Sequence, residues 1–303
     1  MKSRIITFSS RGLGRGQEEI LDGLERRLDG ISKLRPDLVC FPEEVLLSGG
    51  DRNNPRWQEN NAKALGLFRS SARELNTNIA VGLEEPSGDY PGKRYNTGYL
   101  IDRGGNIIGR YRKRHITFRA VGDGLPGERL AVADTDIGRI GLSVCFDIGW
   151  RDDWQRLAEM GARLVVWPSA YHGGNLLNAY AAVHCYNIVS SVWNAQSRVI
   201  DVFGNTIAES SDWDSLAIAE IDLGAEIFHF DRQENKIAEL RAELGDRVSF
   251  RIEPRGNMFE LSINDPALTM SGIKERFGLM SYRDYHLESE KVNDELRRQY
   301  PER

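Results

Sequence analysis

Short apolar segments alternate with longer amphipathic segments along this chain, and that alternation is typical of an α/β fold. Arg4–Phe8, Leu38–Phe41 and Ile79–Leu83 predict buried strands. Between them, Glu18–Leu34 and Asn61–Leu75 carry apolar residues at helical spacing with charged residues on the other face. A chain that places helices between successive strands is expected to build a layered structure with helices on the outside.

Two hairpins interrupt this alternation. The first joins Tyr95–Ile101 to Ile107–Tyr111 through a turn that contains two glycines, and the second joins Ser197–Val202 to Thr206–Glu209 through Phe203-Gly204-Asn205. Gly and Asn supply the positive φ angles that tight hairpin turns need. Because hairpins pair strands antiparallel, we expect mixed sheets.

The C-terminal part has a different character. Ile227–Leu244 predicts a charged amphipathic helix, Val248–Ile252 alternates as a strand does, and the remaining residues form a highly charged tail. The chain of 303 residues has no internal repeat and no linker rich in Gly, Ser or Pro. We therefore expect one domain over residues 1–245, with residues 246–303 as an extension that acts as a dimer arm or a pocket lid.

Composition excludes several classes of function. Lys plus Arg number 40 and Asp plus Glu 45, for a net charge of −5, and a mildly acidic chain is a poor general nucleic-acid binder. No apolar run approaches the roughly 18 residues of a membrane-spanning helix, and the first residues predict a strand, not a signal peptide. Three cysteines do not suggest a disulfide framework. These features favour a cytoplasmic protein without a membrane or nucleic-acid partner.

Three segments place a reactive residue at the end of a predicted strand, where α/β folds gather their sites. They are Phe41-Pro42-Glu43-Glu44, Tyr111–His115 with Lys113, and Val144-Cys145-Phe146-Asp147. A thiol is a strong nucleophile once a base takes its proton, a buried carboxylate is a suitable base, and an ammonium can stabilise an oxyanion. Taken singly, a cysteine at such a position is more often a buried thiol without reactivity, a glutamate is more often a loop carboxylate, and a lysine is more often solvated.

Taken in order, these segments resemble the nitrilase, or carbon–nitrogen hydrolase, superfamily. The matching motifs are the strand ending in Phe-Pro-Glu43, Gly109-Arg110-Tyr111-Arg112-Lys113-Arg114-His115, Pro126-Gly127 with Cys145-Phe146-Asp147, Pro168-Ser169-Ala170, Asp201–Glu209 and Ile218–Asp222. The resemblance implies that Cys145 is the nucleophile, Glu43 the general base and Lys113 the oxyanion-stabilising cation, with the backbone N–H of Phe146 as a second donor. It also implies a four-layer α-β-β-α sandwich with two mixed sheets, no metal or organic cofactor, and a homodimer or higher homo-oligomer.

Two departures from the family pattern bear on substrate and geometry. Many members carry a second glutamate a few residues before the Pro-Gly, whereas this chain offers only Asp123 there and Glu128 just beyond. Either residue is a candidate replacement. In addition, nitrile-cleaving members tend to read Cys-Trp-Glu, whereas Cys145-Phe146-Asp147 is more similar to the amidase and carbamoylase branches. Asp147 is then expected to hold the turn after the cysteine by hydrogen bonds.

Further residues are candidates for the pocket lining. Trp150, Tyr171 and His172 follow the strand ends, and Trp167 is a candidate for either the pocket or the sheet core. A papain-like pair of Cys145 with His172 or His184 is the alternative base arrangement, which nothing in the local sequence supports.

We therefore predict a hydrolase that cleaves a non-peptide C–N bond in a small molecule, a linear amide or N-carbamoyl compound, through a cysteine thioester with release of ammonia or an amine. Nitrile cleavage is less expected. The alternatives are an acyltransferase of the same fold and a catalytically weak homologue that serves as a binding or scaffold protein.

Overall fold

The computed structural model describes residues 2–194 and 196–302 of the chain. These residues divide into two compact units, residues 2–223 and residues 224–302. No helix within the described ranges is both long and apolar enough to cross a bilayer.

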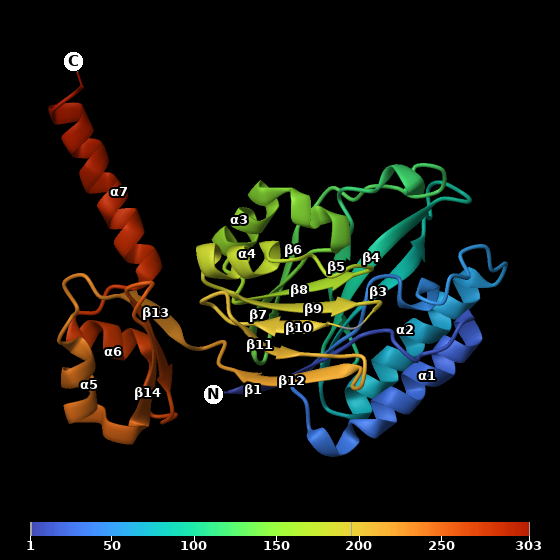
Figure 1. The fold of residues 1–303 in the computed structure, drawn as a ribbon, viewed down its shortest axis with the longest axis horizontal. Helices are drawn as coiled ribbons and strands as arrows, with labels where there is room; N and C mark the ends of the chain where they lie inside the picture. Colours follow the sequence, from blue (N-terminus) through green and yellow to red (C-terminus); the bar gives the residue numbers. More distant parts are fainter. Residues whose placement is uncertain (1, 195, 303) are drawn as a thin grey trace. The chain divides into compact units, whose positions relative to one another are not determined.

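Two six-stranded mixed sheets build the first unit (Figure 1). The first sheet has the order β12-β1-β2-β3-β4-β5. Its strands β1, β2 and β3 run parallel, and β12, β4 and β5 join antiparallel at the edges. The strands are β1 (Ser3–Phe8), β2 (Leu38–Cys40), β3 (Asn78–Pro86), β4 (Arg94–Ile101), β5 (Ile107–Arg112) and β12 (Leu216–Ile221).

The second sheet repeats this arrangement with the order β11-β10-β9-β8-β7-β6. Its strands β7, β8 and β9 are parallel, and the others are antiparallel. The strands are β6 (Ala131–Thr135), β7 (Gly138–Leu142), β8 (Leu164–Ser169), β9 (Asn187–Val192), β10 (Arg198–Ile200) and β11 (Thr206–Glu209). The expected hairpins are the pairs β4–β5 and β10–β11, so the prediction of mixed sheets is confirmed.

Successive residues of the central strands point into different layers. In β1, Ile5 packs between the two sheets, whereas Ile6 packs against the helices outside the first sheet. In β8, Val166 packs between the sheets and Val165 packs against the helices outside the second sheet. Side chains of a strand alternate between its faces, so a strand that is apolar throughout must be covered on both sides.

Helices cover the two outer faces (Figure 1). The outer face of the first sheet packs on α1 (Gln17–Gly30) and α2 (Trp57–Glu74), and the outer face of the second packs on α3 (Arg151–Glu159) and α4 (Leu176–His184). The result is the predicted α-β-β-α sandwich with two mixed sheets.

The second unit is a small α/β unit of its own. A three-stranded sheet of order β13-β15-β14 packs against helices through a core that includes Phe228, Leu240 and Phe259. Its elements are β13 (Glu226–His229), α5 (Lys236–Leu244), β14 (Val248–Glu253), β15 (Met258–Ile263), α6 (Met270–Phe277) and α7 (Tyr282–Gln299).

This unit corrects one sequence-based prediction and moves one boundary. The helix predicted over Ile227–Leu244 begins only at Lys236, because Glu226–His229 pairs with β15 as a strand. The structure divides the chain after Leu223, and a boundary after residue 245 would separate α5 from the β14–β15 hairpin on which Leu240 and Leu244 pack. The expected action of residues 246–303 as a dimer arm or lid stays a prediction.

Candidate active site

Glu43 lies in the loop that follows β2, close against the neighbouring strand β3. A Cβ atom at Gly82 of β3 would lie 2.5 Å from the Cα of Glu43 and 2.9 Å from the backbone nitrogen of Glu44. Only glycine therefore lets this loop approach the strand so closely. Glu44, the next residue, has a φ angle of 38°, which is left-handed and uncommon for a residue with a side chain.

Lys113 follows β5 and is fixed through its backbone. Its N–H donates to the carbonyl of Asn96, 2.8 Å away, and its carbonyl accepts from the N–H of Gly127, also at 2.8 Å. A Cβ at Gly127 would lie 2.1 Å from the carbonyl oxygen of Arg112, so this close approach also requires glycine. The Pro126-Gly127 motif thus holds the strand end that presents Lys113.

Cys145 opens a short 3₁₀ helix (Cys145–Gly149) after β7 and has a φ angle of 49°. Asp147, which is fully buried, fastens this turn: it accepts from the Tyr111 hydroxyl at 2.7 Å and from the N–H of His115 at 2.8 Å. The predicted structural role of Asp147 is confirmed. A left-handed nucleophile in a tight turn after a strand is the geometry of a nucleophile elbow.

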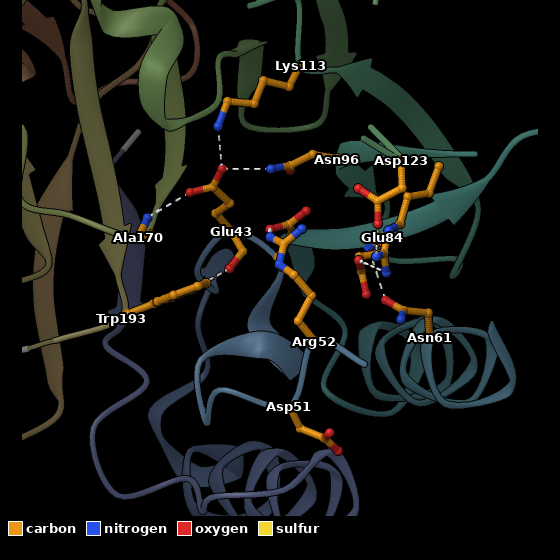
Figure 2. Close-up of polar contacts among 12 residues, drawn as sticks. Glu43, Asp51, Arg52, Asn61, Glu84, Asn96, Lys113, Asp123, Ala170 and Trp193 are labelled. Atoms are coloured by element: carbon orange, nitrogen blue, oxygen red, sulfur yellow. Dashed lines mark hydrogen bonds and ion pairs between the residues drawn. The ribbon is translucent and has the colours of Figure 1, made fainter. Parts of the chain in front are cut away.

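The carboxylate of Glu43 is the centre of a network of hydrogen bonds from Lys113, Asn96 and Ala170 (Figure 2). Its Oε1 accepts from Lys113 Nζ at 2.7 Å and from Asn96 Nδ2 at 2.7 Å, and its Oε2 accepts from the N–H of Ala170 at 2.8 Å. The negative charge of this carboxylate also acts on the thiol of Cys145, which lines the same pocket. Glu43, Lys113 and Cys145 are 3%, 5% and 7% exposed, so the three groups interact in a largely dry environment.

Burial sets the protonation of this site. Burial and the negative charge of Glu43 raise the pKa of Cys145 to about 12, although Lys113 acts in the opposite direction. Burial alone would lower the pKa of Lys113, but the adjacent Glu43 outweighs it and raises that pKa above its ordinary value. The resting site therefore holds a neutral thiol beside an ammonium ion.

These groups open into a pocket of about 160 Å³. Its wall also carries further charged residues, Glu44, Arg52, Arg94 and Asp123, and the loop around Ile116–Leu125 closes one side. Among the described residues, no three His, Cys, Asp or Glu side chains are grouped as they would be to hold a metal ion.

The structure separates the two candidates for the missing second glutamate. Asp123 lines the pocket and pairs with Arg94, which in turn lies 2.7 Å from Glu84. Glu128 is exposed and does not line the pocket.

The residues expected to line the pocket after the strand ends lie in different environments. Trp167 is fully buried in the core and donates its indole N–H to the carbonyl of Cys145 at 3.1 Å. This hydrogen bond helps to fix the backbone of the turn that carries Cys145. Tyr171 is 46% exposed, next to the site: burial and the charge of Cys145 raise its pKa to about 12. Phe146 is 40% exposed and does not line the pocket with its side chain.

Trp150 and His172 are not among the residues that line this pocket. Trp150 stacks on His115 at 3.7 Å between ring centroids and lines a separate surface pocket with α3. His172 accepts from Gly174 and faces Glu209 on β11. The alternative Cys–His pair also fails, since the thiol faces Glu43, and His184 packs between Tyr180 and Tyr186.

Sequence reasoning missed several residues of the site. Trp193, just after β9, donates its indole N–H to the backbone carbonyl of Glu43 at 2.6 Å, and Asn96 binds the carboxylate itself. Arg52 lines the pocket from the loop before α2, and Arg94 lines it from the first position of β4. The position of Trp193 directly after an apolar strand was the one signal that could have indicated it.

Comparison with known proteins places this geometry in context. The sequence profile described as carbon-nitrogen hydrolase matches residues 16–226. The chain belongs to the carbon–nitrogen hydrolase family. A curated relative from this family is deaminated glutathione amidase of Dictyostelium discoideum, 24% identical over 264 residues, which cover 73% of this chain and 91% of the relative. A probable hydrolase, YhcX of Bacillus subtilis, is 32% identical over 50% of this chain and 31% of its own length.

Solved structures of carbon–nitrogen hydrolases share the fold. Saccharomyces cerevisiae Nit3, a member of branch 10 of the nitrilase superfamily, aligns with a TM-score of 0.66 and 18% identity over 80% of this chain and 94% of its own. An amidase from Nesterenkonia sp. AN1, solved with acrylamide added at its active-site cysteine, aligns with a TM-score of 0.62 and 21% identity over 79% and 99%. These structures show the shared fold, and the profile match over residues 16–226 confirms the predicted membership of the nitrilase superfamily.

Proposed function

We propose that this carbon–nitrogen hydrolase cleaves a linear amide or N-carbamoyl compound through a thioester on Cys145. The observation that carries the proposal is that one buried carboxylate, Glu43, binds the Lys113 ammonium and lines the same pocket as the Cys145 thiol. A base, a cation and a nucleophile gathered in one pocket are what acyl transfer requires.

In the first half-reaction, Glu43 takes the thiol proton as the sulfur attacks the carbonyl carbon. Because the pKa of Cys145 is raised to about 12, the proton leaves in step with the attack and not before it. Lys113 and the backbone N–H of Phe146 stabilise the oxyanion. The C–N bond then breaks, the proton passes from Glu43 to the nitrogen, and ammonia or an amine leaves.

In the second half-reaction, water replaces the leaving group. Glu43 takes a proton from water, the oxygen attacks the thioester, and the C–S bond breaks with return of a proton to sulfur. The sum is amide plus water to carboxylic acid plus ammonia. Asn96 and the N–H of Ala170 keep the Glu43 carboxylate oriented through both halves.

Two observations support an amide or carbamoyl substrate. The residue after the nucleophile is Phe146 and not tryptophan, as in the amidase-like branches that the sequence resembles. The names of the curated relatives and of the solved neighbours include amidases. The pocket of about 160 Å³ fits a small molecule.

The test is ammonia release from a panel of small amides, N-carbamoyl compounds and nitriles, with wild type and Cys145→Ala assayed side by side. We expect release from at least one amide or carbamoyl compound, and a loss of at least about a thousandfold in the variant. Circular dichroism checks that the variant is folded. Retained turnover by a pure, folded Cys145→Ala protein would refute the proposal.

A further inference from the structure

One stretch of the pocket wall, residues 116–125, differs from the rest and is called the wall loop below. Several other wall residues lie in a strand or directly after one, such as Asn96 in β4 and Ala170 after β8. The wall loop belongs to the long connection between β5 and β6, and none of its residues, all of which the structure describes, is buried. It gives the pocket Ile116, Thr117, Ala120, Asp123, Gly124 and Leu125. A segment that buries no side chain has little packing to hold it in one position.

The hydrogen bonds that fasten the wall loop end at one place. Among the described residues, those that join the loop to other parts of the chain all involve Lys93 and Arg94, at the start of β4. The N–H of Arg94 donates to the carbonyl of Asp123, and its carbonyl accepts from the N–H of Leu125, both at 2.9 Å. Lys93 Nζ donates to a backbone carbonyl of the loop at 2.7 Å. Apart from its own chain ends, the loop is therefore fastened at a single point.

Asp123 supplies the ion pair at this point. Its carboxylate pairs with the Arg94 guanidinium, which also binds Glu84 at 2.7 Å and lies 5.1 Å from the centre of the Trp57 ring. Arg94 is thus held by β3 and α2, and Asp123 attaches the loop to it. The described contacts of Asp123 include none to the base, the cation or the nucleophile of the site. Figure 2 shows Asp123 beside Glu84 and apart from Lys113.

We infer that the wall loop is the part of the pocket that opens for the substrate, and that the Asp123–Arg94 pair closes it. Cys145 is only 7% exposed, so a wall that opens gives a substrate and its leaving group a route to the sulfur. The side chain of Asp123 is 37% exposed, and an ion pair that water can reach breaks and re-forms easily. Asp123 is then a positioning residue that holds the loop, and not a substitute for the second glutamate in the chemistry.

Trypsin measures the opening of the wall loop, because Arg119 lies within it and is exposed. Cleavage after Arg119 produces fragments 1–119 and 120–303, which intact mass identifies. Asp123→Asn removes the charge and keeps the shape of the side chain, so this cleavage should be at least about fivefold faster than in wild type. Asp123→Glu keeps the carboxylate and should stay within about twofold of wild type.

Two further variants test the pair from its other side and control for lost surface charge. Arg94→Lys replaces the forked guanidinium by a single ammonium, which cannot hold Glu84 and Asp123 in the same way, so the same cleavage should accelerate by a similar factor. It also serves if Asp123→Asn does not fold by circular dichroism. Asp134→Asn is the matched control and should leave the rate unchanged, since Asp134 pairs with Arg139 on the surface and does not line the pocket.

Alkylation of Cys145 by iodoacetamide, itself a small amide, shows whether opening admits a ligand to the sulfur. Asp123→Asn should raise the rate of modification at least about threefold, as measured by mass spectrometry of the peptide that carries Cys145. Cys40 is fully buried in the core and should stay unmodified in both proteins, which shows that the fold as a whole has not opened.

Turnover distinguishes a positioning role from a catalytic one, and this measurement alone rests on the proposed function. For an amide identified in the ammonia assay, Asp123→Asn should raise KM at least about threefold and leave kcat within about threefold of wild type. A catalytic Asp123 would instead lose about a hundredfold or more in kcat, with tryptic cleavage unchanged, and that result would overturn the inference.

Equal rates of cleavage and of alkylation in wild type and Asp123→Asn would overturn it as well. The two failures are distinguishable. If no compound is turned over, the proposed function fails, and the tryptic and alkylation rates still decide whether the wall loop opens. If turnover depends on Cys145 but neither rate changes in Asp123→Asn, the hydrolase stands and the inference about the loop does not.

Discussion

The Nζ atom of Lys113 lies 2.7 Å from Oε1 of Glu43, and the two side chains are only 6% and 4% exposed. Removing one partner of so deeply buried an ion pair leaves the other charge without compensation, which costs about 3–5 kcal/mol in comparable cases. Lys113→Met should therefore destabilise the fold by about 3 kcal/mol at neutral pH, as measured by denaturant unfolding. Hydrolysis should be lost at the same time.

The double variant Lys113→Met/Glu43→Gln distinguishes the lost pair from lost packing. It should recover most of the stability, because no charge is left buried alone. Lys63→Met is the matched control, since Lys63 pairs with Glu59 on the exposed surface of α2 and should change stability little. A double variant as unstable as Lys113→Met would contradict this account.

The raised pKa of Glu44 should make the stability of the protein depend on pH. Its pKa rises from an ordinary value of 4.5 to about 8 in the fold, mainly through burial and then through Glu43 and Glu84. A raised carboxyl pKa contributes stability below 4.5 that is lost as the pH rises to 8. The stability of Glu44→Gln relative to wild type should therefore rise with pH from 4.5 to 8, and the variant should be more stable by on the order of 2 kcal/mol at pH 8.5. Urea unfolding at pH 5 and pH 8.5 measures the difference, and equal gains at both would count against it.

Gly82 is expected to be essential for the position of Glu43. Alanine there would place its Cβ 2.5 Å from the Glu43 Cα, and a displacement of the base by about 1 Å can lower the rate roughly a hundredfold. The measurement is kcat/KM for a substrate found in the ammonia assay. Gly66→Ala on α2 is the control, because nothing lies within 4 Å of its added Cβ, and it should gain about 0.5–1 kcal/mol of stability. Normal activity in Gly82→Ala would show that the loop can shift freely.

Asp147 is expected to hold the turn of Cys145 through the three hydrogen bonds its side chain accepts. Asp147→Asn replaces one acceptor oxygen by a donor opposite Tyr111 or His115, and should cost about 2 kcal/mol of stability. Activity should fall as well, because the turn sets the position of the sulfur. Asp134→Asn, on the exposed pair with Arg139, should change neither. Full activity with lowered stability would show that the turn keeps its shape without these bonds.

The layers of the fold could be predicted from sequence because they depend on periodicity. β1 and β8 are apolar on both faces, and this dictates covering layers on each side. The helix expected over Ile227–Leu244 was wrong at its start because Ile227 and Phe228 suit a strand as well as a helix, and only pairing with β15 decides between them.

Only the site residues that belong to recognisable sequence motifs could be predicted. Glu43, Lys113 and Cys145 each sit beside a recognisable strand end, whereas Trp193 reaches the carbonyl of Glu43 across 150 positions of sequence. Only the folded structure shows that Asp123 lines the pocket and that Glu128 does not. Loop residues are positioned by tertiary contacts, and these are absent from a single sequence.

The hydrogen bonds to Glu43 have a consequence for the order of events in the proposed reaction. Lys113 and Asn96 together occupy Oε1, and the N–H of Ala170 occupies one side of Oε2, so the carboxylate keeps a single vacancy for a proton. It cannot accept from the thiol and from water at once. In the proposed reaction the nitrogen therefore departs with the first proton before this carboxylate can take a proton from water, so acylation and hydrolysis follow one another in a fixed order.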